Sequence, residues 1–294
     1  MANEAEGRGS PIGVAGAGRV GLALARLLQA EGEPVTAIAS RSPQRSHAAA
    51  ELLGDRVLPV AYAALPLHAG RFLIAVPDGA IADVADVLAS SGANGIALHT
   101  SGAVGLEALS ALAERGVACG TLHPLQTVTG APDAAQVLSG VAFSIWGDPA
   151  AVEWAQSIAK LCGGTTLRIE PEARAMYHAA AVMAGNYVTA LVDAAACLME
   201  HAGVERETAL RALAPLVRAS AENALTRGPV AALTGPIERG DTATVMAHLI
   251  ALERSPTTVQ ALYRAAGLHT LGIARRKGLG AEQAARLERE FNRK

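Results

Sequence analysis

Hydrophobic and polar positions follow two different patterns along this chain. Up to about residue 170, short apolar runs alternate with segments whose apolar residues recur every three or four positions. Apolar runs of this length are typical of buried strands, and the longer period is typical of helices. We therefore predict a doubly wound, mostly parallel sheet with helices on both faces. The expected strands are Ile12–Ala15, Val35–Ala39, Arg71–Val76, Gly95–Leu98, Val117–Leu122, Val141–Trp146 and Thr165–Ile169.

After Pro171 the strand pattern disappears and only the helical period remains. Pro171 suits the first turn of a helix, and the periodic segment that it begins continues to about His201. Further helices are expected over residues 205–226, 242–253, 257–276 and 281–292. We predict two domains, an α/β sheet domain over residues 1–170 and an all-α helical domain over residues 171–294.

Three glycines, Gly16, Gly18 and Gly21, follow the first expected strand and begin the first helix. A G-x-G-x-x-G spacing in this strand–helix setting is typical of a Rossmann dinucleotide-binding loop. The first glycine permits the tight turn, the second lets the backbone approach a pyrophosphate, and the third lets the helix pack against the sheet. The helix N-terminus, at Arg19 and Val20, offers unpaired N–H groups to the phosphates. The alternative is a packing turn without a ligand.

The second expected strand ends in Ser40, Arg41 and Ser42. An NAD site usually has an acidic residue here, which accepts a hydrogen bond from the ribose 2′-hydroxyl. No acid occurs between Glu33 and Glu51. An arginine flanked by hydroxyls would instead bind a 2′-phosphate, so we predict NADP(H) as the cofactor. The alternative is that Arg41 is a solvated loop charge.

Other expected strands also end in polar residues, at the sheet edge where doubly wound proteins bind ligands. The convergence of neutral hydrogen-bonding groups from separate segments favours a catalytic site there. The candidates are Val76, Pro77 and Asp78 for cofactor contact, Ser101 and His123 for catalysis, and His178 and Asn186 for catalysis on the helix that follows Pro171.

Each of these residues has a structural alternative. Asp78 and Ser101 suit the caps of the helices that follow them. His99, His123 and His178 are each compatible with a buried histidine that makes hydrogen bonds but does not react. The three histidines together could hold a metal, but no carboxylate or cysteine lies beside them at metal-ligand spacing, so we expect no metal. No G-x-S-x-G elbow indicates a serine hydrolase.

Composition narrows the class of protein further. The 294 residues are 51% hydrophobic, only 3% aromatic, and carry a formal net charge of −2. This balance favours a large core and gives no sign of a nucleic-acid or anionic-membrane partner. The three cysteines are far apart, the N-terminus lacks a signal-peptide core, and Asp193 interrupts the most apolar helical stretch. We therefore expect a cytoplasmic protein with no disulfide and no membrane span.

The motifs GVAGAGRVG, AVPDGAI, LHTSGA, LHPLQTV, YHAAAVMAGNYVTAL and LTGPIERGD together resemble one bacterial family. Its members have a Rossmann-like domain followed by a helical domain of unknown function. The family is similar to the 6-phosphogluconate-dehydrogenase-like superfamily, which includes ketopantoate reductases, pyrroline-5-carboxylate reductases and β-hydroxyacid dehydrogenases. The resemblance covers about residues 10–275.

This resemblance implies hydride transfer between a nicotinamide and a small carbonyl, hydroxyl or imine compound. It also implies active-site residues on the long helix after the Rossmann domain, and often a homodimer built through the helical domain. Many superfamily members carry a lysine and an asparagine on that helix. Here Asn186 is present, but no lysine occurs between Lys160 and Lys277. We take His178 as the substitute proton donor, since an unperturbed histidine exchanges protons near neutral pH.

The sequence thus predicts an NADP-dependent oxidoreductase with a small-molecule substrate. In this hypothesis His178 or His123 supplies the proton, and Asn186 and Ser101 orient the substrate. Thr234, Arg239 and Asp241 are candidates for closing the cleft, the alternative being a loop ion pair between the last two. Two other functions stay open: an NADP(H)-binding sensor without chemistry, and a deazaflavin-linked NADP reductase.

Overall fold

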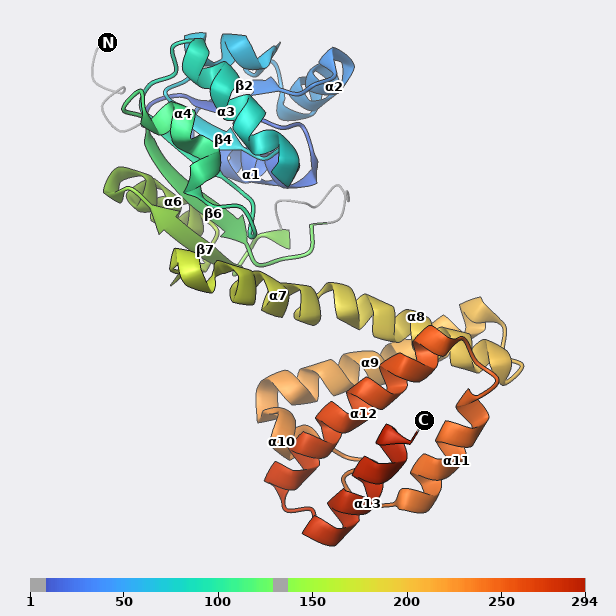
Figure 1. The fold of residues 1–294 in the computed structure, drawn as a ribbon. Coiled ribbons are helices and arrows are strands. Elements are labelled where there is room, and N and C mark those ends of the chain that lie inside the picture. Colours follow the sequence, from blue (N-terminus) through green and yellow to red (C-terminus); the bar gives the residue numbers. More distant parts are fainter. Residues whose placement is uncertain (1–8, 129–136, 294) are drawn as a thin grey trace. The chain divides into compact units, whose positions relative to one another are not determined.

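The computed structural model describes residues 9–128 and 137–293 of the chain. They form two compact units, Met1–Gly185 and Asn186–Lys294 (Figure 1). The division falls inside the long apolar segment that the sequence places wholly in the second domain. The predicted boundary at residue 170 stays a prediction.

The first unit is built on one eight-stranded sheet with the strand order β3-β2-β1-β4-β5-β6-β7-β8. Every neighbouring pair is parallel except β6 and β7, which are antiparallel. The order reverses direction at β1, so the sheet is doubly wound as predicted. The strands are β1 (Ile12–Ala15), β2 (Val35–Ala39), β3 (Leu58–Val60), β4 (Arg71–Ile74), β5 (Ile96–His99), β6 (Ala118–Pro124), β7 (Ala142–Gly147) and β8 (Thr165–Arg168).

All seven expected strands are present, with ends that differ by at most two residues from the predicted ones. Strand β3 was not expected. It has only three residues, Pro59 lies at its centre, and it pairs with β2 at the sheet edge. A proline is tolerated in such an edge strand, because one side of the strand needs no ladder hydrogen bond. The same proline argues against a strand when only the sequence is considered, so β3 was not predicted.

Helices cover both faces of the sheet. Alternate residues of each central strand point to opposite faces, so Leu73 enters one core cluster while Phe72 and Ile74 enter the other. Helices α1, α2 and α6 pack on the first face and α3 and α4 on the second. Their bounds are α1 (Arg19–Ala30), α2 (Pro43–Leu53), α3 (Ile81–Ser90), α4 (Ser110–Ala113) and α6 (Pro149–Leu161). The predicted α/β fold class is thereby confirmed.

The predicted helix over residues 171–201 is divided in the structure. A short 3₁₀ helix, Pro171–Ala173, leads into α7 (Arg174–Ala184), and Gly185 separates α7 from α8 (Asn186–His201). Gly185 has φ −107° and ψ −74°, away from the helical values, and glycine destabilises a helix interior. Helix α7 belongs to the sheet unit, where it lies beside β6 and β7 (Figure 1).

The second unit is entirely helical over its described residues. Its core forms where α11, α12 and α13 meet, around Val245, Leu249, Leu271, Leu287 and Phe291. The helices after α8 are α9 (Arg206–Arg227), α10 (Pro229–Ala232), α11 (Thr242–Leu252), α12 (Thr257–Lys277) and α13 (Ala281–Asn292). Helix α10 was not expected, and the other four lie close to their predicted bounds.

One helical segment of the described chain, Pro171–His201, is long and apolar enough to cross a membrane by length and composition. The expectation that no segment meets this criterion is therefore not confirmed. Within this segment, Tyr177 bonds to His123 of the sheet, which places α7 against protein. Only 6% of its most apolar window is buried, however, so most of its apolar surface is uncovered within a single chain.

Candidate active site

The glycine-rich loop after β1 has the geometry that a dinucleotide-binding turn requires. Gly16 has φ +125°, and a Cβ added there would lie 2.2 Å from the Ala75 carbonyl oxygen. A Cβ at Gly21 would lie 2.1 Å from the Gly16 oxygen, so the start of α1 packs directly on the loop. Gly18 is different, because a Cβ there would meet nothing within 4 Å. Two glycines are thus required by the fold, and Gly18 leaves open space above the backbone.

The first turn of α1 faces this open space with unpaired donors. Gly18 is the N-cap residue and offers no side-chain cap, and no acidic residue lies in the first turn. The N–H groups of a first helical turn have no acceptor within the helix and lie at the positive end of its dipole. Arg19 is exposed and Val20 is half-buried at this end. These residues can hold a pyrophosphate through backbone amides.

At the end of β2, Arg41 is exposed, and in the described part of the chain it makes no salt bridge. The neighbouring serines are partly occupied. Ser42 caps α2 by accepting a hydrogen bond from the Arg45 N–H group (3.4 Å), and Ser40 Oγ donates to the Ser42 carbonyl (2.7 Å). The serines therefore order the turn, and the uncompensated charge at this strand end is that of Arg41.

The end of β4 lies next to the glycine loop. The same Cβ added at Gly16 would approach the Val76 nitrogen to 3.1 Å, so Val76 borders the turn. Pro77 precedes a short 3₁₀ helix, Asp78–Ala80, which has no side-chain cap. Asp78 is exposed, and its carboxylate lies close enough to His99 and His123 to favour their protonated forms. The capping alternative for Asp78 is not what the structure shows.

His99, at the end of β5, is completely buried. Its Nδ1 accepts a hydrogen bond from the Ser101 N–H group (3.3 Å), and burial lowers its pKa to about 4. The ring is therefore neutral at pH 7, and its role is to order the loop that follows. Ser101 Oγ accepts hydrogen bonds from the N–H groups of Ala103 (3.1 Å) and Val104 (3.0 Å). A serine hydroxyl that accepts two bonds still has its own proton to donate.

Three separate segments meet at Gly102. A Cβ added there would lie 2.8 Å from His178 Nδ1 and 2.9 Å from His123 Nε2, so both imidazoles lie directly against this backbone. The two rings pack edge to face with centroids 6.0 Å apart. The structure thus brings together Ser101 from the loop after β5, His123 of β6 and His178 of α7.

A tyrosine fixes the orientation of His123. Tyr177 Oη lies 2.7 Å from His123 Nδ1, and the rings are perpendicular. Burial raises the pKa of Tyr177, with a smaller opposing effect from a hydrogen bond with Ser144, so the phenol keeps its proton at neutral pH. Which of Tyr177 and His123 donates in their shared hydrogen bond depends on the tautomer of the histidine ring.

The tautomer of His123 determines what its ring can do. Burial, together with the neighbouring His178, lowers the pKa of His123 to about 4, so its ring is neutral near pH 7. When Nδ1 accepts from Tyr177, the neutral ring carries its proton on Nε2. Nε2 is the atom beside Gly102. In that tautomer Nε2 of His123 is a neutral hydrogen-bond donor, and the low pKa makes the ring unsuited to deliver a proton as an imidazolium at pH 7.

His178 is the other imidazole of this site. Its Nδ1 is buried, and among the described residues it has no hydrogen-bond partner. A buried ring nitrogen without a partner is costly in a protein interior unless a ligand or water completes it. The unpaired nitrogen lies against Gly102, so it is available to a group bound at this strand edge.

Sequence reasoning missed two features of this site. Tyr177 was not among the predicted site residues, although it contacts His123 directly. Arg174 and Glu107 both lie against Gly105, where an added Cβ would be 2.3 Å from Arg174 Nη1 and 2.0 Å from Glu107 Oε2. The YH pair at the start of α7 was the available signal for Tyr177. No local sequence pattern predicts that Glu107 and Arg174 lie near the same backbone position.

The other candidates lie in the second unit. Asn186 is the first residue of α8, and its predicted role stays a prediction. Asp193 forms an ion pair with Arg206. Asp241 is the N-cap of α11, where it accepts hydrogen bonds from the Thr244 N–H group (3.0 Å) and hydroxyl (2.7 Å). Asp241 thus stabilises a helix start within its own unit.

No group of three or more histidine, cysteine or acidic side chains that could hold a metal occurs in residues 9–128 and 137–293. Three surface cavities of the described chain are lined by residues of the helical unit alone. The site at Gly102 is therefore identified by its histidine and serine side chains and by the glycine loop on the same sheet edge. The size of a cavity does not identify it.

Two family models match the chain. Residues 5–124 match a Rossmann-like domain, and residues 141–270 match a domain of unknown function, DUF2520. A search of curated proteins found no significant match.

Solved structures of similar fold span most of the chain. A provisionally assigned NADP oxidoreductase from Bacteroides fragilis has a TM-score of 0.71 and 22% identity, covering 90% of this chain and 98% of its own. Protein TM1727 from Thermotoga maritima has a TM-score of 0.72 and 23% identity, covering 90% and 99%. A 1-pyrroline-5-carboxylate reductase from Streptococcus pyogenes has a TM-score of 0.60 and 19% identity, covering 96% of each chain.

These matches agree with the architecture described above. The Rossmann-like match covers β1 to β6, which carry the glycine loop and the strand-end residues. The second match begins at β7 and includes α7 and most of the helical unit. The chain is therefore a Rossmann-like domain joined to a DUF2520 domain, which confirms the resemblance predicted from its motifs.

Proposed function

We propose that this protein is an NADP-dependent oxidoreductase that acts on a small polar carbonyl, hydroxyl or imine compound. One observation carries the proposal: the imidazoles of His123 and His178 meet the backbone of Gly102 on the same sheet edge as the dinucleotide loop. The strand order β1-β4-β5-β6 makes that edge continuous from the glycine loop to the histidines. The fold neighbours named as an NADP oxidoreductase and a pyrroline-5-carboxylate reductase support the same class.

The residues of the first unit fit an NADP cofactor. The space above Gly18 and the open first turn of α1 suit a pyrophosphate. The exposed guanidinium of Arg41 suits a 2′-phosphate, and β2 ends without the acid that would repel it. Val76 and Asp78 border the path from this loop to the histidines. When bound, a nicotinamide supplies hydride transfer to or from carbon.

The residues around Gly102 bind and orient the substrate in this proposal. The Nε2–H group of His123 donates a hydrogen bond to a substrate oxygen or nitrogen, and Tyr177 holds it in that state. The hydroxyl of Ser101 donates a second bond from the neighbouring loop. Fixed neutral donors of this kind stabilise negative charge that develops on a carbonyl oxygen or imine nitrogen.

His178 moves the proton in this proposal. Its Nδ1 is buried without a partner among the described residues and lies against Gly102, whereas Nδ1 of His123 is engaged by Tyr177. No lysine lies between Lys160 and Lys277 to act in its place. Asn186, the first residue of α8, is the substrate-orienting residue in this proposal.

The test is NADPH turnover with a panel of 2-oxo acids and cyclic imines. His178→Ala and Asn186→Ala are each expected to lower kcat/KM by at least about a hundredfold, the usual contribution of a positioned acid–base group. His269→Ala on α12, an exposed histidine of the helical unit, is the matched control and keeps full activity. Binding of NADPH without turnover of any substrate would favour a sensor without chemistry, and flavin-analogue binding would favour a deazaflavin-linked reductase.

We also propose that the protein forms a homodimer through its helical unit. Tyr187, Val188 and Leu191 of α8 and Leu216 and Leu225 of α9 are exposed, and they give these helices an uncovered apolar surface. Large exposed apolar patches on folded chains mark interaction surfaces. Light scattering of the purified protein tests this, with Leu191→Glu expected to yield monomers. A monomeric wild type would refute the dimer.

A cytoplasmic location completes the proposal. Cys119, Cys162 and Cys197 are all free. Burial raises the pKa of the Cys119 and Cys162 thiols to about 11, so both stay protonated and inert. Free thiols are typical of a reducing compartment. Fractionation of cells that produce the protein measures this directly.

A further inference from the structure

A surface cavity of about 620 Å³ lies within the helical unit, bordered by α8, α11 and α12. Its size is within the range of small-molecule sites. The walls are largely apolar and include Leu198 and Leu252, which also pack on the helical core. The polar lining residues are His201, His248, Arg254, Ser255 and Tyr263.

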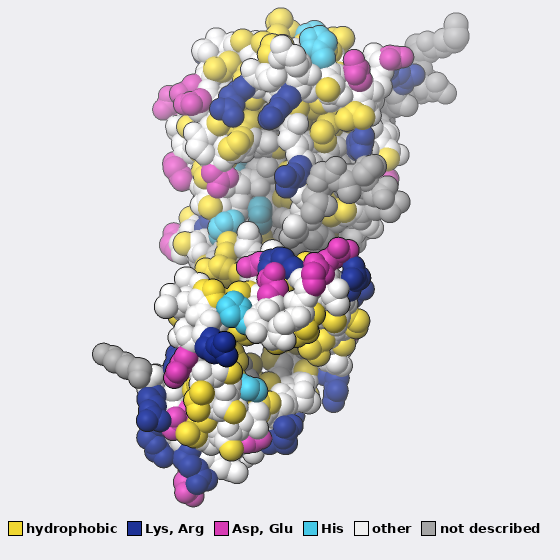
Figure 2. Space-filling model, turned by 90° about the vertical axis from the view of Figure 1, so that its right-hand side faces the viewer, with side chains coloured by type: hydrophobic (Ala, Val, Ile, Leu, Met, Phe, Trp, Pro, Cys, Tyr) yellow, Lys and Arg dark blue, Asp and Glu magenta, His cyan; other side chains and the backbone are white. Residues whose placement is uncertain are grey.

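The charge on this lining is of one sign. Arg254 contributes a guanidinium, and no acidic side chain lines the cavity. Arg254 is exposed, and no acidic partner pairs with it among the residues that the structure describes. Figure 2 faces this side of the helical unit and shows histidine and basic side chains beside a hollow. Arg254 is therefore the one charged guanidinium that the described residues contribute to the lining of this cavity.

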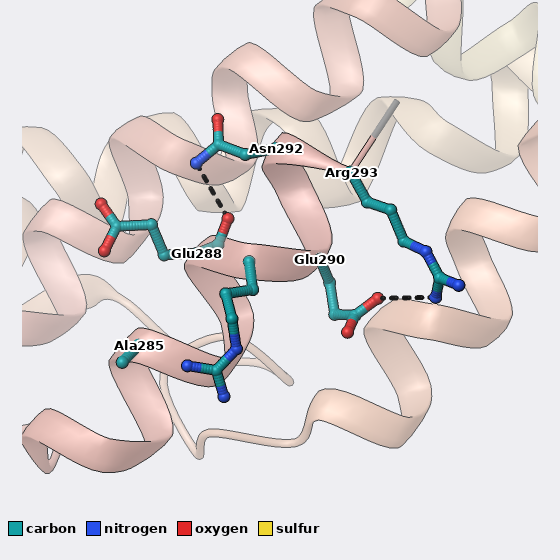
Figure 3. Close-up of a pocket in the computed structure, with 6 residues that line it drawn as sticks. Ala285, Glu288, Glu290, Asn292 and Arg293 are labelled. Atoms are coloured by element: carbon teal, nitrogen blue, oxygen red, sulfur yellow. Dashed lines mark hydrogen bonds and ion pairs between the residues drawn. The ribbon is translucent and has the colours of Figure 1, made fainter.

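Two other cavities of the helical unit provide the contrast. The cavity of about 600 Å³ on α13 has both glutamates and arginines in its lining (Figure 3). There Arg293 pairs with Glu290 (3.7 Å), and Glu288 pairs with Arg275 (2.7 Å). A third cavity, of about 430 Å³, also contains Glu290 and Arg293. The charges of those two cavities are balanced by their own side chains, whereas the charge at Arg254 is not.

The aromatic pair in the cavity presents a further donor. Tyr263 Oη lies 2.8 Å from His248 Nδ1, and burial raises the pKa of Tyr263, so the phenol keeps its proton. Which of Tyr263 and His248 donates in this bond depends on the tautomer of the ring. When Tyr263 donates, the neutral His248 ring carries its proton on Nε2, and a protonated ring carries one there as well. In both of those states Nε2 of His248 is a donor.

His201 has the complementary arrangement. Its Nδ1 lies 2.9 Å from the Cys197 carbonyl oxygen, which can only accept, so Nδ1 is the protonated nitrogen. The main-chain carbonyls near the end of α11 are also occupied. Ser255 N–H and Oγ both donate to the Leu252 oxygen, and Arg254 N–H donates to Ala251. With Nδ1 protonated, Nε2 of the neutral His201 ring is an acceptor, so the guanidinium of Arg254 is the group in the lining that attracts an anion.

We propose that this cavity binds a small organic carboxylate with an apolar body. Arg254 and the Nε2–H group of His248 bind the carboxylate, and the leucine and tyrosine walls bury the apolar part. An arginine guanidinium matches the two oxygens of a carboxylate with two parallel donors. The site is separate from the dinucleotide loop, and the inference does not depend on the proposed oxidoreductase activity.

Isothermal titration calorimetry of the full chain with phenylacetate, compared with neutral 2-phenylethanol, tests the proposal. Phenylacetate is expected to bind once per chain, and the alcohol at least about tenfold more weakly, because one charged hydrogen-bonding group is worth that much. Arg254→Gln should weaken phenylacetate binding by about tenfold. Arg276→Gln is the matched control, an exposed arginine at the end of α12, and should leave it unchanged.

Three results would overturn the inference. They are no phenylacetate binding by the wild type, equal affinity for the acid and the alcohol, and equal losses in the two arginine variants. One bound phenylacetate per two chains, with Arg254 protected from a guanidine-modifying reagent in the ligand-free protein, would also overturn it, because the cavity would then be a subunit contact. Both variants are checked for unchanged thermal unfolding first. NADPH binding is measured in parallel, so failure of one site is distinguishable from failure of the other.

Discussion

The sheet unit and the helical unit have similarly apolar sequences but use them differently. In the sheet unit, strands such as β1 and β4 are buried along their whole length between two helical layers. In the helical unit, α8 buries only Ala196 and α9 only Ala209. The strands of the sheet unit are covered within that unit, whereas α7, α8 and α9 leave most of their apolar surface exposed.

This difference in burial indicates which kind of binding site each unit can form. Parallel strands place residues from distant parts of the chain at one edge, which is how Gly16, Gly102 and His123 come together. The well-packed sheet also holds those residues in fixed positions. The helical unit offers surface instead, both apolar helices and a cationic cavity.

The largest expected effect separates folding from binding within the glycine loop. Gly16→Ala places a Cβ against the Ala75 carbonyl at a positive φ, so the free energy of unfolding should fall by at least about 3 kcal/mol. Gly18→Ala meets no atom within 4 Å and should unfold like the wild type, while NADPH binding is lost. Urea unfolding and calorimetry measure the two effects. A Gly18→Ala protein that binds NADPH normally would contradict the assignment of that space to the pyrophosphate.

The buried histidines of the sheet unit predict a pH dependence of stability. The folded pKa values of His99 and His123 are about 4, below the ordinary value of about 6.5, so only the unfolded chain takes up these protons between pH 6.5 and 4. The stability contributed by each neutral ring is complete above pH 6.5. It decreases by as much as roughly 3 kcal/mol per histidine as the pH falls to 4.

The matched variant is His99→Gln, which cannot be protonated in either state. Urea unfolding at a series of pH values should show a smaller loss of stability for the variant than for the wild type below pH 6.5. Equal losses in the two proteins would mean that His99 is not the buried neutral group described above.

Tyr177→Phe should have a smaller effect, on the site alone. Removing the hydroxyl frees His123 Nδ1, so the ring no longer has a single tautomer. If the proposed chemistry is right, kcat should fall by about tenfold, the value of one lost hydrogen bond, with KM nearly unchanged. Imidazole ¹⁵N spectra should show the Nε2–H form of His123 in the wild type and a mixture in the variant. An unchanged spectrum would remove Tyr177 as a positioning residue.

The smallest expected effect is stabilising and lies in the helical unit. Gly272 is inside α12, and a Cβ there meets nothing within 4 Å. Gly272→Ala should therefore raise the free energy of unfolding by about 0.5–1 kcal/mol, because alanine loses less backbone entropy in a helix. A thermal unfolding curve measures it. Destabilisation by this change would show that the space over Gly272 is covered, for example by a second copy of the chain.

Much of this fold could be predicted because it depends on local patterns. The strands and helices follow from apolar periodicity, and the glycine loop follows from its spacing. Strand β3 was missed because three residues with a central Pro59 carry almost no periodic signal. The break at Gly185 was missed because one glycine in a long apolar run does not by itself end a helix.

The site was predictable only in outline. The strand ends placed His123 and Ser101 at one edge, since parallel topology alone requires it. The bond from Tyr177 to His123 depends on how α7 packs against β6, which no local pattern encodes. The lowered pKa of His123 has the same origin, because burial is a property of the assembled fold. The candidate side chains could therefore be predicted from the sequence, whereas their protonation states depend on how the folded chain packs around them.

The central claim is that the first unit binds NADP through the glycine loop and Arg41. Calorimetric titration of the wild type and of Arg41→Ala with NADPH and NADH tests it most directly. We predict that the wild type binds NADPH at least about tenfold more tightly than NADH, and that Arg41→Ala loses this preference while still binding NADH. Equal affinity for the two cofactors in the wild type, or no binding of either, would contradict the claim.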